Sequence, residues 1–211
     1  MIQSKSNNRF KTCFLLLLIL TGMTGFFVLI NGKTGSFHLI NSCHNSFFDF
    51  FFQYFTHAGD GLVWILPGLY CIFFNKKYLV AVISGIIIST LLTHLLKRII
   101  YPDELRPITY LSENFPVHIV EGVKMNRMNS FPSGHTATAF TIVLLTGFIV
   151  KKKVWVYILP MAALLVGYSR VYLAQHFATD VLAGMCVGII SAILSIMIFR
   201  ELTKKKALLS Q

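Results

Sequence analysis

The chain has 211 residues, of which 55% are hydrophobic and only 13% are charged, and its formal net charge is +11. Soluble domains usually have about a quarter of their residues charged, so this composition argues against a soluble protein and predicts that most of the chain lies in a bilayer. The length accommodates about six spanning helices of ~20 residues each, together with their loops.

Six apolar segments follow one another along the chain. The first follows three basic residues, as a signal sequence does, but it is long and has no small-residue cleavage site after it, so we interpret it as a retained anchor. The second, 61–75, has 15 uncharged residues, so to cross the bilayer it needs Asp60 or the Phe-rich stretch before it near its outer end. The fifth, 154–169, has 16 uncharged residues. Because these two segments are short, four or five spans stay an alternative to six. The remaining segments are longer: 12–32, 78–96, 129–150 and 181–199.

The basic residues are unevenly distributed if the N-terminus lies inside. The inner segments then carry twelve Lys and Arg residues and one acid, Glu201, whereas the outer segments and helix ends carry seven bases and seven acids. This asymmetry follows the positive-inside rule and predicts a multi-pass protein of the cell membrane with both termini in the cytoplasm. The inner lysines suit contacts with anionic lipids, and no nucleic-acid partner is expected.

No linker or repeat divides the chain, so we expect a single domain over residues 1–211. The four cysteines show no metal-ligand spacing and predict no disulfide framework. The large outer loop contains three prolines and is not expected to form one long helix. The alternation of spans predicts outer loops at 33–46, 101–130 and 171–177, inner turns at 75–77 and 151–153, and an inner tail at 200–211.

Several bases lie at or near the outer ends of the predicted spans. Lys97 and Arg98 end the third span, Arg106 follows in the loop, and Arg170 ends the fifth span. A charge at membrane depth is costly and usually has a partner, although snorkelling at a helix end explains Lys97 and Arg98 equally well. Ordinary loop charges are expected at Lys33, Lys124 and Arg127.

Two histidines are predicted at the same depth. His135 begins the fourth span in "PSGHT", and His176 lies four residues before Asp180 in "SRVYLAQHFATD". On a helix, residues four apart share one face, so Asp180 would accept a proton from one nitrogen of His176. This pairing fixes the tautomer and makes the histidine a better nucleophile or base.

Two histidines among several cations indicate phosphoryl-transfer chemistry. Guanidinium groups match the oxygens of phosphate, and the start of the fourth helix would offer the backbone amides of Ser133 and Gly134 to an anion. One histidine would attack phosphorus while the other protonates the departing oxygen. No metal and no cofactor are expected.

The motifs resemble the three-part signature of the type 2 phosphatidic-acid-phosphatase superfamily. "PSGH" at 132–135 and Ser-Arg at 169–170, with His176 and Asp180, match its second and third parts completely. The first part, a lysine, six residues and Arg-Pro, departs here, because eight residues separate Lys97 from Arg106. We assign the extra residues to a bulge in "YPDE" and the lysine role to Lys97, with Arg98 as the rival.

The resemblance implies a six-helix, all-α membrane phosphatase with its site at the outer membrane face and its catalytic motifs within 97–180. It implies that His176 forms a phosphohistidine, that Asp180 orients it, and that His135 is the general acid and then helps to activate water. The substrate would be a lipid phosphate or diphosphate in the bilayer. The implied phosphate-binding residues are Lys97, Arg106, Ser133, Gly134 and Arg170.

Other functions fit parts of the pattern. A lipid-to-lipid phosphotransferase of the same superfamily would carry the same motifs, and the soluble haloperoxidases that share them are disfavoured by six spans. An intramembrane serine protease would pair Ser133 with His176 but leaves the arginines unexplained. A transporter or channel that binds anions would use the same cluster without releasing phosphate.

Overall fold

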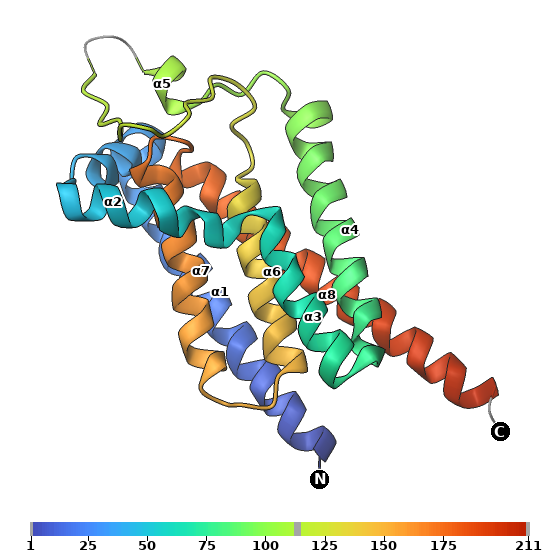
Figure 1. Cartoon of the computed structure of the whole chain (residues 1–211). Helices are drawn as coiled ribbons and strands as arrows, with labels where there is room; N and C mark the ends of the chain where they lie inside the picture. The colour runs from blue at the N-terminus through green and yellow to red at the C-terminus, as the bar shows by residue number, and fades with distance from the viewer. Residues whose placement is uncertain (1, 112–114, 210–211) are drawn as a thin grey trace.

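The computed structural model describes residues 2–111 and 115–209, and this part of the chain forms helices and no strands, as predicted. The long helices form a bundle with both termini at one end (Figure 1). The helices are α1 (Ile2–Asn41), α2 (Ser46–Phe55), α3 (Ile65–Phe74), α4 (Leu79–Leu95), α5 (Pro107–Tyr110), α6 (Gly134–Ile149), α7 (Trp155–Tyr172) and α8 (Ala178–Leu209). Short 3₁₀ turns form η1 (Thr56–Gly59), η2 (Gly61–Trp64) and η3 (Lys76–Tyr78), and η4 (Leu96–Ile100) is a π-helical turn.

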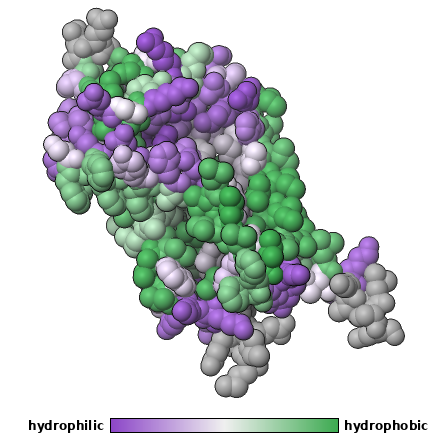
Figure 2. All heavy atoms as spheres, viewed as in Figure 1, coloured by the Kyte–Doolittle hydropathy of each residue, from purple (hydrophilic) through white to green (hydrophobic). Residues whose placement is uncertain are grey.

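The surface of the bundle fits a multi-pass membrane protein. Four helices in the described residues are long and apolar enough to cross a bilayer, and Ser46–Gly59 with Gly61–Phe74 makes a fifth if this pair, bent by 52°, crosses as one span. Large apolar side chains on these helices, such as Phe26, Leu29 and Phe73, are exposed. Figure 2 shows this apolar surface between two polar ends.

Helix α6 is the sixth candidate span, and it is short. Its 16 residues reach about 24 Å at the rise of an α-helix, less than the ~30 Å of a bilayer core. Most of its side chains are buried against neighbouring helices, because α6 packs against α1, α4, α7 and α8. A central helix that faces protein rather than lipid does not need the full span length, and the count of six remains a prediction.

One of the predicted connections is wrong. Residues 33–41, predicted as part of an outer loop, continue α1 beyond a kink at Gly32, where φ is 68°. This backbone conformation is strained for residues with a side chain, so glycine lets the helix bend and continue. The segment predicted as an inner tail, 200–211, belongs to α8 as far as Leu209.

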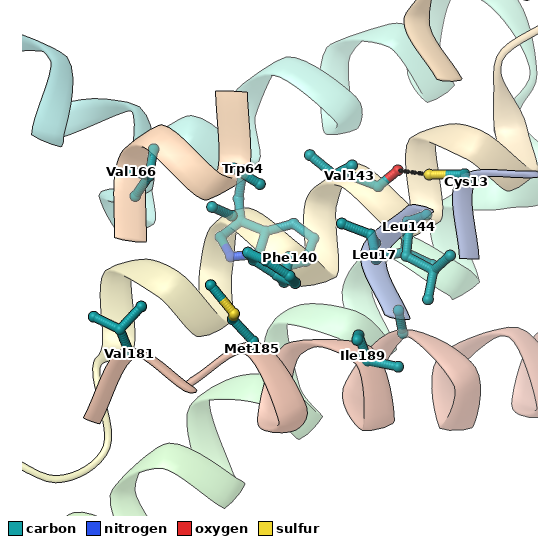
Figure 3. Packing of buried hydrophobic residues seen from close by; sticks show 14 of the residues in the cluster. Cys13, Leu17, Trp64, Phe140, Val143, Leu144, Val166, Val181, Met185 and Ile189 are labelled. Atoms are coloured by element: carbon teal, nitrogen blue, oxygen red, sulfur yellow. Dashed lines mark hydrogen bonds between the residues drawn. The ribbon is translucent and has the colours of Figure 1, made fainter. Parts of the chain in front are cut away.

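The core of the bundle forms around α6. Figure 3 shows Phe140 of α6 next to Trp64 and Met185, and all three side chains are buried. The thiol of Cys13 donates a hydrogen bond to the carbonyl of Val143, which ties α1 to the same helix. This packing fixes the height of α6 in the bundle, and with it the position of His135 near its N-terminus.

Glycines bring α8 into close contact with α6. A Cβ atom at Gly188 would lie 2.6 Å from Cβ of Phe140 and 2.7 Å from the carbonyl oxygen of Ala137. At Gly184 it would lie 2.6 Å from the carbonyl oxygen of Ser133. Small residues at helix interfaces allow such close backbone packing in membranes, and here they hold the starts of the two helices together.

Replacing Gly188 by alanine should therefore destabilise the bundle, by about 1–3 kcal/mol, because the added methyl overpacks the α6–α8 contact. Thermal unfolding in detergent, followed by the fluorescence of buried Trp64, measures this effect. Gly22→Ala in α1 is the matched control, since a Cβ there meets no atom within 4 Å. Equal unfolding midpoints for the two variants would contradict the packing argument.

Candidate active site

The predicted site residues lie together at the end of the bundle that is opposite the termini. Lys97 follows α4, His135 lies in the first turn of α6, Arg170 lies in the last turn of α7, and Asp180 lies in the first turn of α8 (Figure 1). Residues 173–177, which link α7 to α8, contain His176. Four helix ends and one short link therefore build the site.

His176 is positioned differently from the prediction. It precedes α8, so it does not share a helix face with Asp180; instead the tight link folds back on the start of that helix. Its Nδ1 lies 3.4 Å from Oδ2 of Asp180, and both side chains are almost fully buried. The two groups are close, as expected from the spacing, but this contact is longer than an ordinary hydrogen bond, and Nδ1 has no hydrogen-bond partner in the described residues.

Asp180 organises the surroundings of this link. Its carboxylate accepts hydrogen bonds from the Ser130 hydroxyl at 2.5 Å, the Phe177 amide at 2.9 Å and the Thr179 hydroxyl at 3.3 Å. Its backbone carbonyl accepts one from the amide of Ser133 at 2.9 Å. Asp180 thereby joins the "PSGH" segment, the preceding loop and the His176 link.

The electrostatic environment keeps His176 neutral. Burial lowers the pKa of this imidazole well below its usual value, and the positive charges of Arg106, Arg170 and Lys97 lower the pKa further. A histidine with a lowered pKa is unprotonated at neutral pH. Only the unprotonated ring has a lone pair with which to attack an electrophile.

The two arginines are buried around this histidine. Arg106 donates from Nη1 to the carbonyl and side-chain oxygens of Gln175, at 2.9 and 3.1 Å, and from Nε to the carbonyl of Met128 at 3.0 Å. Arg170 donates from Nη1 to the hydroxyl of Thr56 at 2.7 Å, while its Nε is buried and has no hydrogen-bond partner in the described residues.

The site cations have no carboxylate partner. Within residues 2–111 and 115–209, the ion pairs involve neither Lys97 nor Arg106 nor Arg170. Burying unpaired positive charge is costly, and an arrangement of this kind is stable when it binds an anion. The planar guanidinium groups and their spare donors suit an oxyanion with several oxygens, such as phosphate.

The structure explains part of the departure in the first motif. A π-helical turn, Leu96–Ile100, follows α4, with the amide of Tyr101 bonded to the carbonyl of Leu96 at 2.8 Å. Such a turn accommodates one residue more than an α-turn. The expected bulge in "YPDE" therefore begins earlier, within the helix. Lys97 is half-buried there, and its positive charge helps to lower the pKa of His176, whereas Arg98 is exposed.

The start of α6 differs from the expectation in one respect. Ser133 was expected to offer its amide to an anion, but that amide is donated to the carbonyl of Asp180. The Ser133 side chain instead caps the helix, because its oxygen accepts hydrogen bonds from the amide and the hydroxyl of Thr136. The amide of Gly134, the first residue of α6, makes no backbone hydrogen bond to the loops of the described residues. The hydroxyl of Ser133 contacts Thr136 rather than His176, which disfavours a serine protease.

Lys33, expected to be an ordinary loop charge, lies in the continued part of α1 and contacts the site's surroundings. Its Nζ is 3.2 Å from a carboxylate oxygen of Glu104 and lies over the ring of Phe177. The carbonyl of Glu104 accepts a hydrogen bond from the amide of Ser130, whose hydroxyl binds Asp180. This chain of contacts holds the loop between α4 and α6 against the link that contains His176.

Sequence reasoning missed the contribution of η1 and the residue after it. Thr56 binds Arg170, and Oδ1 of Asp60 lies 2.7 Å from Nε2 of His135. The other oxygen of Asp60 lies 2.6 Å from Nδ1 of His57. The signal in the sequence was Asp60, a carboxylate beside an apolar segment at the predicted depth of the site. The sequence analysis placed it only at the outer end of a span.

Fold and site together define a helical membrane protein with two histidines and a cluster of cations at one end of the bundle, and these cations form no ion pair within the described residues. The sequence model of the PAP2 superfamily matches residues 62–204, which is more than half of the chain. The chain belongs to the PAP2 superfamily.

Solved structures agree with this assignment. The crystal structure of LpxE from Aquifex aeolicus has a TM-score of 0.68 and 32% sequence identity, covering 78% of this chain and 94% of that one. The PAP2-type phosphatidylglycerolphosphate phosphatase from Bacillus subtilis has a TM-score of 0.63 and 25% identity, covering 92% and 96%.

Curated relatives match over shorter stretches. The lipid A 4'-phosphatase of Porphyromonas gingivalis is 26% identical over 147 residues, which are 67% of this chain and 62% of that protein. Phosphatidylglycerophosphatase B of Bacillus subtilis is 44% identical over 70 residues, or 34% of its length. The chain thus spans less than two thirds of either relative.

Proposed function

We propose that this chain is an integral membrane phosphatase that hydrolyses a lipid phosphate or diphosphate through a phosphohistidine at His176. The observation that carries the proposal is the set of three cations, Lys97, Arg106 and Arg170, without a carboxylate partner in the described residues and next to a buried, neutral histidine. A phosphate group would supply the missing negative charge and place phosphorus within reach of the ring.

The proposed reaction has two steps. In the first, Nε2 of His176 attacks phosphorus, because Nδ1 faces Asp180, and the bond from phosphorus to the leaving oxygen breaks. His135 gives its proton to that oxygen. In the second step water attacks the phosphohistidine, His135 takes a proton from the water, and phosphate leaves while His176 is restored. The cations and the Gly134 amide bind the phosphate oxygens throughout, and no step needs a metal.

An apolar groove next to the site supports a lipid substrate. The groove has a volume of about 460 Å³ and runs between α3, α6 and α7. Its lining includes Leu66 and Tyr70 of α3, Ile142 of α6, and Leu159 and Val166 of α7. A hydrocarbon chain in this groove would lie beside the bundle while its phosphate reaches the cations at the end of the helices.

The relatives' names give the range of substrates to test. The names of similar proteins include a lipid A 4'-phosphatase and a phosphatidylglycerolphosphate phosphatase. Phosphatidic acid and a polyprenyl diphosphate offer the same phosphate group at a membrane surface. We further propose that the site faces the outside of the cell membrane, because the basic inner segments lie at the opposite end of the bundle, with the termini.

The test is phosphate release by the purified full chain in detergent micelles. Each of these lipids is supplied in turn, and free phosphate is measured with and without a metal chelator. Release from at least one lipid, unaffected by the chelator, is expected. Transfer of phosphate to an acceptor lipid without free phosphate would indicate a phosphotransferase, and no reaction with any lipid would contradict the proposal.

Lys97→Ala is expected to lower kcat/KM on the preferred lipid by about 10- to 100-fold, because a charge-assisted contact with phosphate contributes roughly 1.5–3 kcal/mol. Arg98→Ala, in the same π-helical turn, should have little effect because Arg98 is exposed. Steady-state kinetics on the two variants decide between the residues. If only the Arg98 variant loses activity, the lysine of the first motif is assigned wrongly.

A further inference from the structure

The two histidines of the site each face a carboxylate, but the two pairs differ. His176 is 3.4 Å from Asp180, whose carboxylate already accepts hydrogen bonds from three other donors. His135 is 2.7 Å from Asp60, whose carboxylate has His57 as its only other partner in the described residues. The Asp60 carboxylate is thus far more available to its histidine than the Asp180 carboxylate is.

The course of the backbone around Asp60 places its carboxylate next to His135. Asp60 lies at the break between η1 and η2, where the α2 and α3 segments bend by 52°. Gly59 makes the approach possible, because a Cβ atom there would lie 2.8 Å from Cβ and 2.9 Å from the carbonyl oxygen of His135. The Asp60 side chain makes no helix-capping hydrogen bond, so its carboxylate is not needed for the bend itself.

We propose that Asp60 is a positioning residue for His135, outside the three-part signature, which orients the ring and neutralises its charge when it acts as the general acid. With Nε2 bound to Asp60, Nδ1 is the nitrogen that gives its proton to the leaving oxygen. This inference rests on the proposed phosphatase function, to which it adds Asp60 as the residue that positions the general acid His135.

The charges around His135 explain why a counter-charge is needed. Arg170 of α7 and His176 interact electrostatically with His135, and so do His57 of η1 and Asp60, the residue after η1. A protonated ring next to an arginine is unfavourable unless a carboxylate compensates. Asp60 lies close enough to compensate that charge when His135 carries the proton, so the two histidines stand in different environments and can serve the two roles of attack and proton donation.

The test compares two leaving groups in Asp60→Asn. Dodecyl phosphate has an alkoxide leaving group that requires protonation, whereas 4-nitrophenyl phosphate has a leaving group that departs with little help. The readout is kcat/KM, which covers only the steps up to departure of the leaving group. We expect a loss of about 100-fold or more on dodecyl phosphate, the usual contribution of a general acid, and a small loss on 4-nitrophenyl phosphate.

The pH profile supplies a second readout that a purely structural role would not move. The alkaline limb of kcat/KM for dodecyl phosphate should move to lower pH in Asp60→Asn, because the His135 imidazolium loses its counter-charge. Asp49→Asn is the matched control: Asp49 also pairs with a histidine, His118, at 2.8 Å, and its side chain is similarly exposed. The control should keep the wild-type ratio between the two substrates and the wild-type pH profile.

The outcomes separate this inference from the proposed function. If the wild-type chain hydrolyses dodecyl phosphate and Asp60→Asn loses equally on both substrates, Asp60 only supports the structure and the inference is overturned. A gain in kcat/KM would overturn it too, because the carboxylate would then merely compete with phosphate. If the wild-type chain hydrolyses neither this substrate nor any lipid phosphate, the proposed function itself fails.

Discussion

His176→Ala is expected to abolish phosphate release, with kcat lowered by about 10⁴-fold or more, as is typical when a nucleophilic group is removed. The reason is that the variant lacks the nitrogen that attacks phosphorus, while the cations that bind phosphate remain. Substrate should therefore still bind. The measurement is phosphate release by purified variant in detergent micelles, alongside lipid binding to the same preparation.

A second histidine provides the control for this loss. His118 also lies next to a carboxylate, Asp49 of α2, near the same end of the bundle, but its ring otherwise contacts His44 and Tyr172 rather than the site cations. His118→Ala should retain most of the activity. Wild-type turnover by His176→Ala, in protein that elutes as a folded species, would refute the assignment of the nucleophile.

Arg170→Ala should lower kcat/KM by about 10³-fold, because an arginine that stabilises a transferring phosphoryl group contributes on this scale. Arg170 is buried, and its Nε has no hydrogen-bond partner in the described part of the chain, so this donor is available to phosphate. Arg170→Lys should recover only part of the loss, since an ammonium group lacks the planar fork. Steady-state kinetics on the preferred lipid measure both variants.

Arg106→Ala should cause a similar loss of activity, with a further loss of stability, because Arg106 also bonds to Gln175 and Met128. Arg127→Ala, which changes an exposed loop arginine, is the control and should retain activity. Equal activity of Arg170→Ala and the wild-type chain would show that the unpaired guanidinium does not bind the substrate.

The proximity of the motif residues could be predicted from the sequence, because the ends of spanning helices lie at the membrane surfaces. Once the spans alternate, Lys97, His135 and Arg170 must lie at one level, and the spacing of His176 and Asp180 keeps them together. The all-helical class follows from the long apolar runs. These predictions depend on local sequence patterns and on the similar length of the membrane-spanning segments.

Other features depend on contacts between distant segments and left little signal. The bond from Asp60 to His135 joins residues far apart in the chain, and it forms only because Gly59 permits a close approach. The amide of Ser133 is taken by a carbonyl of another helix. The continuation of α1 beyond Gly32 also escaped prediction, because polar residues after a glycine are equally typical of a loop.

The central claim is that His176 becomes covalently phosphorylated during turnover. It is tested most directly by mixing the wild-type chain with a radiolabelled lipid phosphate, quenching in base within the first turnover, and mapping the labelled peptide by mass spectrometry. We predict label on His176 in the wild-type chain and none in His176→Ala. Turnover without any labelled protein, or label that persists in His176→Ala, would contradict the mechanism.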